Sequence, residues 1–116
     1  YAPESFSPTK IKSETLTVNF KKNPDIAAAV GKIKGSAALC VFAAETNDLI
    51  KNASAKLKAK NADMIVANDV LKEGAGFDKD TNIITVIDSQ GVTDYPLMSK
   101  AQTADVILDR LRQFVK

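Results

Sequence analysis

The chain has 116 residues, a formal net charge of +2, 45% hydrophobic residues and 26% charged residues, a composition typical of a globular domain. It has no histidine and a single cysteine, Cys40, which excludes a Ser-His-Asp or Cys-His nucleophile, a His-ligated metal, an internal disulfide and a Cys-cluster metal site. No apolar run approaches the ~20 residues that span a bilayer, and the charge is too small to favour nucleic acid. We therefore expect one reduced, cytoplasmic domain over residues 1–116, with no membrane or nucleic-acid partner.

The N-terminal residues divide into two parts. Residues 1–9 contain two prolines and little apolar content, so they are predicted to form an irregular arm. In residues 10–20, Leu16, Val18 and Phe20 alternate with polar residues, which predicts a β-ribbon with one buried face. Because that face needs something to cover it, the ribbon is a candidate dimerisation element.

An α/β core is expected over residues 23–116. Asn23-Pro24-Asp25 has the pattern of a helix start, with an N-cap residue followed by proline. The continuous apolar run at 37–44 predicts a strand covered on both faces. Thr46 is expected to cap the next helix, and residues 64–67 predict a second buried strand. Strand, helix and strand in this order indicate a parallel βαβ unit.

The remaining elements complete this pattern. Residues 83–87 predict another strand, and the turn at 88–91 leads into residues 92–95. Ser99 and Gln102 have the spacing of a capping box at the start of the last helix. The predicted fold class is α/β: a Rossmann-like three-layer sandwich with a mainly parallel sheet and an N-terminal β-ribbon.

Ligands of open α/β sheets bind at the carboxyl ends of strands, and polar or small residues gather there at 43–46, 67–69 and 74–78. Ala43 and Ala44 would let a ligand approach the backbone, next to the free N–H groups of a helix start. Ordinary helix capping with tight packing explains the same residues, and on residue chemistry alone it is the more frequent case.

Lysines crowd the end of the helix that follows, at Lys56, Lys58 and Lys60. They are candidate phosphate ligands, although a solvated face that complements the helix dipole is the more frequent explanation. Phe77 either packs on the core or lies against a base. Four aspartates could help to hold Mg²⁺, but their spacing names no metal ligand: Asp63, Asp69, Asp78 and Asp80. No glycine fingerprint follows any strand, which disfavours a dinucleotide oxidoreductase.

Six short motifs then follow one another along the chain: KNPDI (22–26), FAAET (42–46), KLKAKNAD (56–63), VANDV (66–70), Gly76-Phe77 with Asp80 and Asn82, and PLMSK (96–100). Their order resembles the C-terminal half of phosphopantothenoylcysteine synthetase, also called phosphopantothenate–cysteine ligase. In many bacteria this enzyme is the second half of a bifunctional protein, behind a flavin-dependent decarboxylase. The resemblance extends from about Lys10 to the end of the chain.

The resemblance implies a CTP-dependent ligase of coenzyme A biosynthesis. In that reaction the carboxylate of 4′-phosphopantothenate attacks the α-phosphate of CTP, which gives an acyl-cytidylate and pyrophosphate, and the amine of cysteine then displaces CMP. Mg²⁺ would accompany CTP, FMN would be present only if a decarboxylase domain precedes this chain, and the ribbon would form a homodimer.

Residue by residue, Lys56 matches the family's essential lysine, which would contact the triphosphate or the acyl-nucleotide. Residues 58–62 match a flap that closes over the intermediate. Phe77 matches an aromatic residue near the base, while Asn68 lies in a family segment that either contacts ligand or forms a turn. The binding residues implied by the resemblance are Ala43, Ala44, Lys58, Lys60, Asn68 and Phe77.

One departure from the family is large. The Gly-Gly-Thr nucleotide loop and the intermediate-binding asparagine of the synthetase's N-terminal half do not occur in this sequence. We therefore expect the chain to be a fragment of the ligase that is inactive by itself. The alternative hypothesis is a non-catalytic nucleotide-binding or dimerisation module on the same α/β scaffold.

Overall fold

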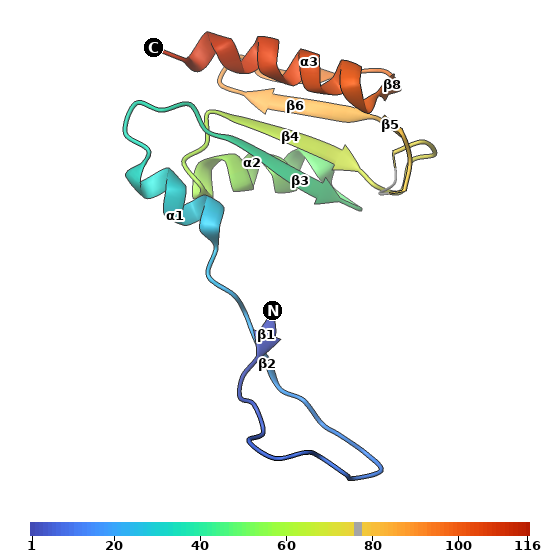
Figure 1. Ribbon diagram of the computed structural model, residues 1–116. Coiled ribbons are helices and arrows are strands. Elements are labelled where there is room, and N and C mark those ends of the chain that lie inside the picture. Colours follow the sequence, from blue (N-terminus) through green and yellow to red (C-terminus); the bar gives the residue numbers. More distant parts are fainter. Residues whose placement is uncertain (76–77) are drawn as a thin grey trace.

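The computed structural model describes residues 1–75 and 78–116, and its centre is a four-stranded sheet (Figure 1). The strands are β3 (Cys40–Glu45), β4 (Met64–Asp69), β6 (Ile84–Asp88) and β7 (Gly91–Asp94), arranged in this spatial order. Strands β3 and β7 therefore form the two edges of this sheet.

The strand directions are mixed, so the prediction of a mainly parallel sheet is wrong. Strand β3 pairs in parallel with β4, but β4–β6 and β6–β7 are antiparallel pairs. Helix α2 (Leu49–Ala59) connects β3 with β4, and such a crossover is what a parallel pair needs. The chain reaches β6 without a helix among the described residues and enters β7 through a tight turn, and both connections suit antiparallel strands.

Helices cover both faces of the sheet, as the three-layer prediction requires (Figure 1). On the α2 face, Ile65 and Ala67 pack with Ala53 of α2. On the opposite face, Val66 and Val86 pack with Ile107 of α3 (Lys100–Leu111). We call these two sides the α2 face and the α3 face. Because successive side chains of a strand point to opposite sides, β3, β4 and β6 each supply residues to both cores.

Helix α1 (Ile26–Ile33) packs against the end of α2 with almost no space between the two backbones. A Cβ added at Gly31 would lie 1.8 Å from the carbonyl oxygen of Lys60. The Asn61 side-chain amide donates a hydrogen bond to the Gly31 carbonyl at 2.9 Å. The N-cap of α1 is Asp25, which accepts from the Ala28 N–H at 3.0 Å, so the helix begins two residues later than the Asn23 cap predicted.

The N-terminal arm projects away from the core (Figure 1). It is closed at its base where β1 (Ala2–Pro3) pairs with β2 (Phe20–Lys21) in an antiparallel arrangement. Residues 10–19 contain no strand, so the predicted ribbon is limited to these short pairs. Alternation alone does not form a strand when neither a neighbouring strand nor a core covers it.

The C-terminal part is fastened by specific polar contacts. Strand β5 (Thr81–Asn82) pairs with β8 (Met98–Ser99), and the predicted capping box starts α3, with Ser99 and Gln102 bonded reciprocally at 3.1 and 3.0 Å. A 3₁₀ turn, η1 (Arg112–Phe114), follows α3. By contrast, Asp48 and not Thr46 occupies the N-cap of α2. In the part of the chain that the structure describes, no helix could cross a membrane.

Candidate functional site

The carboxyl ends of β3 and β4 lie side by side and divide the predicted site residues between two faces. Ala44 is opposite Asn68, and Glu45 is opposite Asp69. Ala43 belongs to the core on the α2 face, so the alternation of the strand turns Ala44 and Asn68 to the α3 face and Glu45 to the α2 face.

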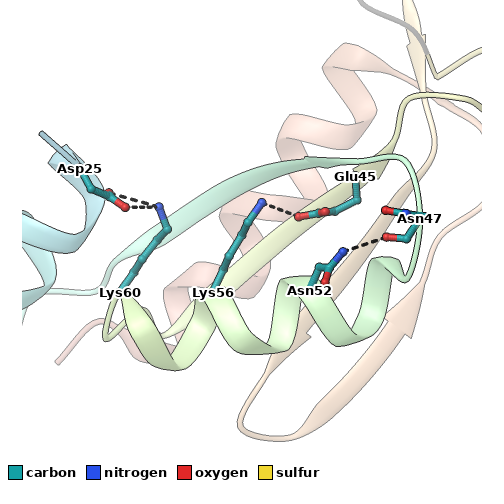
Figure 2. A network of polar contacts seen from close by, with 6 residues as sticks. All are labelled: Asp25, Glu45, Asn47, Asn52, Lys56 and Lys60. Carbon is teal, nitrogen blue, oxygen red and sulfur yellow. Dashed lines mark hydrogen bonds and ion pairs between the residues drawn. The ribbon is translucent and has the colours of Figure 1, made fainter. Parts of the chain in front are cut away.

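On the α2 face, Lys56 is held by a buried carboxylate. Its Nζ lies 2.6 Å from Oε1 of Glu45, and Figure 2 shows the lysine leaning along α2 toward the end of β3. The Glu45 side chain is 8% exposed and the Lys56 side chain 43% exposed. Asn52 stabilises the adjoining turn by donating a hydrogen bond to the carbonyl of Asn47 at 3.0 Å. The Lys56 ammonium is thus held at the carboxyl end of β3, while part of the lysine side chain still faces solvent.

The other two predicted lysines lie elsewhere on the helix. Lys60 Nζ contacts Asp25 Oδ2 at 3.0 Å and so points to α1 and away from Glu45 (Figure 2). The Ala28 N–H and the Lys60 ammonium hold the pKa of Asp25 below its usual value. Lys58 is exposed. The structure therefore does not bring Lys58 and Lys60 together with Lys56 at the strand ends.

On the α3 face, the strand ends border a hollow of about 250 Å³. Its lining residues are Phe42, Ala43, Ala44, Val66, Asn68, Asn82, Ile84 and Lys100. Asn68 donates a hydrogen bond from Nδ2 to the carbonyl of Ala75 at 3.1 Å, while its shielded Oδ1 has no hydrogen-bond partner among the residues that the structure describes. The hollow thus brings Ala44 and Asn68 together, and Ala43 also borders it although its side chain belongs to the core on the α2 face. The predicted Phe77 lies outside the described residues.

Sequence analysis missed Asn82 and Lys100, which complete the polar part of this hollow. They meet because β5 pairs with β8 and because the Lys100 N–H donates to the carbonyl of Asp80 at 2.9 Å. A pair of two-residue strands has almost no signal in sequence. The one signal that could have pointed to Lys100 is the PLMSK motif, which ends at this residue.

Asp63 and Asp69 have structural partners, and the Cys40 thiol is neutral. Burial raises the pKa of Asp63, but the Leu39 N–H and the Lys34 ammonium outweigh it, so the pKa lies below the usual value. Asp69 accepts from the Leu71 N–H at 3.2 Å. Burial raises the pKa of the Cys40 thiol to about 11, so the thiol is neutral at pH 7. Within residues 1–75 and 78–116, no three acidic or cysteine side chains are grouped as a metal site.

Comparison with known proteins shows the family to which the chain belongs. The family described as "DNA/pantothenate metabolism flavoprotein C-terminal domain" matches residues 1–115. The chain belongs to this family. Among its curated relatives, the coenzyme A biosynthesis bifunctional protein CoaBC of Bacillus subtilis (strain 168) is 39% identical over 119 residues, which is 100% of this chain and 29% of the relative. The corresponding protein of Escherichia coli (strain K12) is 36% identical over 111 residues, covering 95% of this chain and 27% of the relative.

Another relative, from an unknown prokaryotic organism, is named cysteine/cysteine sulfinic acid decarboxylase. It is 43% identical over 119 residues, 99% of this chain and 33% of its own length. The chain thus spans about a third of the length of the curated relatives that it matches.

Two solved structures share the fold. The C-terminal domain of CoaBC superposes with a TM-score of 0.69 and 34% identity, over 83% of this chain and 44% of that chain. The DNA/pantothenate metabolism flavoprotein from Streptococcus pneumoniae gives a TM-score of 0.72 at 22% identity, over 90% of this chain and 46% of that chain. The mixed α/β core is therefore a property of the family and not of this sequence alone.

Proposed function

We propose that this chain is part of a CTP-dependent ligase that joins cysteine to 4′-phosphopantothenate in coenzyme A biosynthesis, in the cytoplasm. The observation that carries the proposal is the ammonium of Lys56, fixed 2.6 Å from Glu45 at the carboxyl end of β3, in a chain matched over nearly its whole length by CoaBC proteins. A fixed cation at a strand end is suited to the negative charge of a nucleotide phosphate.

In the proposed first step, a carboxylate oxygen of 4′-phosphopantothenate attacks the α-phosphorus of CTP, and the bond to the β-phosphate breaks to release pyrophosphate. Lys56 stabilises the charge that accumulates on the phosphate oxygens. In the second step, the neutral amine of cysteine attacks the acyl carbon, CMP leaves with the bonding electrons, and the amine loses a proton to solvent. Both steps rely on positioning and electrostatics and need no histidine.

The other predicted residues have supporting roles in the proposal. Ala43, Ala44 and Asn68 border the hollow on the α3 face and would contact the acyl-nucleotide there, with Phe77 near the base. Lys58 and Lys60 belong to the segment that would close over it, which requires Lys60 to exchange Asp25 for the ligand. Magnesium enters as the CTP complex, for which one or two protein carboxylates are sufficient. We assign no flavin to these residues.

The proposed enzyme is a homodimer joined through the arm, and the 116 residues alone are proposed to be inactive. The chain covers 44% of the solved CoaBC C-terminal domain, so the rest of a complete site would come from other parts of the polypeptide. The second candidate, a non-catalytic nucleotide-binding or dimerisation module, shares the arm and the fold but predicts no turnover in any context.

The test is an amide-formation assay on the natural polypeptide that contains this chain. The polypeptide is incubated with Mg²⁺, cysteine, 4′-phosphopantothenate and either CTP or ATP, and the amide and pyrophosphate are measured by mass spectrometry and phosphate release. We expect turnover with CTP, and a loss of about 100-fold or more in kcat for Lys56→Gln with the fold intact. No amide product in the natural polypeptide, or unchanged turnover in Lys56→Gln, contradicts the assignment.

Two further measurements separate the alternatives. The isolated chain is expected to form no amide, and amide formation by it would contradict the proposed inactivity. In the natural polypeptide, CTP is expected to raise the melting temperature more than ATP, because a ligand that prefers the native state stabilises it. Equal stabilisation by both nucleotides would remove the assignment of CTP.

A further inference from the structure

Glu45 is the buried partner of the lysine that the proposed function makes central. We propose that Glu45 is a positioning residue: it holds the Lys56 ammonium at the carboxyl end of β3, ready for an anionic phosphate, without touching the substrate itself. This inference rests on the proposed function, because it concerns how Lys56 is made ready for that reaction.

The carboxylate is in a fixed place. Glu45 is the last residue of β3, aligned with Asp69 of β4, and its backbone carbonyl accepts from the Val70 N–H at 3.3 Å. Its side chain is 8% exposed, so it is held between the sheet and α2. A buried carboxylate on a paired strand end is a rigid anchor compared with a carboxylate on a loop.

The lysine it holds is otherwise flexible. Lys56 projects from α2 with four rotatable methylene links, and such a side chain loses much rotational freedom when it is ordered. The ammonium has three donors, of which one bonds to Glu45 at 2.6 Å. Since 43% of the lysine side chain is exposed, a ligand can approach it from the solvent side. The cost of ordering this side chain is then met on folding rather than when the ligand binds.

The ion pair of Lys60 with Asp25, at the end of α2, differs from the pair of Lys56 with Glu45 in the exposure of its carboxylate. Asp25, the partner of Lys60, is 46% exposed and also caps α1 through the Ala28 N–H. Its presence is thus explained by the helix that it starts. Among the described residues, Lys56 is the hydrogen-bond partner of the Glu45 side chain. A side chain buried for a single contact with a site lysine is better explained by that lysine than by the stability of a helix.

The charge of Glu45 works against its positioning role, and this conflict gives the proposal a measurable signature. A carboxylate beside the ammonium repels an incoming phosphate, so neutralising Glu45 strengthens anion binding. Loss of the anchor, in contrast, leaves Lys56 unplaced in the transition state. A positioning role therefore predicts a lower kcat without a higher KM, whereas an ordinary stabilising pair predicts a change in melting temperature alone.

The test compares Glu45→Ala and Glu45→Gln in the natural polypeptide. Glu45→Ala is expected to lower kcat about tenfold or more, with KM for CTP unchanged or lower. In Glu45→Gln the amide oxygen still accepts from Lys56, so most of kcat should return, while KM for CTP falls about two- to fivefold, an estimate for the loss of one nearby like charge. The control is Asp88→Asn, which weakens another buried ion pair, with Arg110, outside the proposed site, and should lower the melting temperature but not kcat.

The outcomes separate this inference from the function on which it rests. If Lys56→Gln keeps full turnover, the proposed role of Lys56 fails. If Lys56→Gln is inactive but Glu45→Ala retains its kcat, the positioning role alone is wrong. Should Glu45→Ala fail to fold, Glu45→Gln decides the matter, and a KM for CTP that is unchanged or raised in that variant overturns the proposal.

Discussion

Apolar side chains are buried in the core of this protein but exposed in its N-terminal arm. In the core, Ile65 and Val86 are completely shielded from solvent. In the arm, Phe6 is 89% exposed and Leu16 62% exposed. Hydrophobic burial is the main favourable term in folding, so the core accounts for its own stability. The arm has no such source within one copy of the chain, which is the physical reason to propose that a partner covers it.

The largest effect on stability is expected in the centre of the sheet. Ile65→Ala removes a fully buried side chain from the core between β4 and α2, and we expect a loss of about 2–5 kcal/mol. Urea unfolding followed by circular dichroism measures it, with Ile65→Val as the control at about 1 kcal/mol. A loss below that of the control would mean that the packing on the α2 face is looser than described.

Gly31→Ala is expected to cause the next largest loss of folding stability. Alanine normally stabilises a helix relative to glycine by about 1 kcal/mol, but here the new Cβ would meet the Lys60 carbonyl at 1.8 Å. Because backbone atoms cannot move aside easily, we expect a net loss of about 1–3 kcal/mol. The matched control is Ala29→Gly on the exposed side of α1, with a loss of at most about 1 kcal/mol. A gain in stability for Gly31→Ala would place α1 further from α2.

Asp63 is expected to have a smaller and pH-dependent effect. Its folded pKa is lowered, so the stability it contributes is fully present above the unfolded pKa, near 3.8, and is lost as the pH falls through the folded value. Wild type should therefore exceed Asp63→Asn by on the order of 1 kcal/mol at pH 7 and by less at pH 3. Parallel urea titrations at the two pH values test this, and a difference that grows at pH 3 would reverse the assigned sign.

The arm should show the smallest effect on folding and a distinct effect on association. Leu16→Ser combined with Phe20→Ser alters exposed side chains, so unfolding of dilute protein should change by no more than about 0.5 kcal/mol. Sedimentation velocity should show self-association of the wild type that weakens in the double variant. A wild type that stays monomeric at all concentrations would contradict the proposed role of the arm.

Much of the core could be predicted from residues because its signals are local. The apolar run predicted at 37–44 forms β3 at Cys40–Glu45, and the capping box at Ser99 and the turn before Gly91 appear where expected. The antiparallel direction of β6 departs from the predicted mainly parallel sheet, because no crossover helix follows Asp69 among the described residues. The direction of a strand depends on the segment that connects it to its neighbour rather than on the strand itself. The segment between β4 and β6 is a polar stretch in the sequence.

The candidate site was less accessible to sequence reasoning. Lys56, Lys58 and Lys60 look equivalent along the chain, but Glu45 holds the first and Asp25 the third. Which carboxylate pairs with which lysine depends on how α1 and β3 flank α2, and no local pattern encodes that. The same reason explains why Lys100 was not grouped with Asn68, 32 positions earlier.

Strand β3 lies at a border of the sheet, with Phe42 on it 69% exposed. Its outward N–H and C=O groups pair with no strand among the described residues. An exposed edge strand of this kind readily pairs with a strand of another chain. Concentrated preparations of these 116 residues should therefore tend to aggregate through this edge, in addition to the association proposed for the arm. Measurements on the isolated chain should therefore be made at low protein concentration.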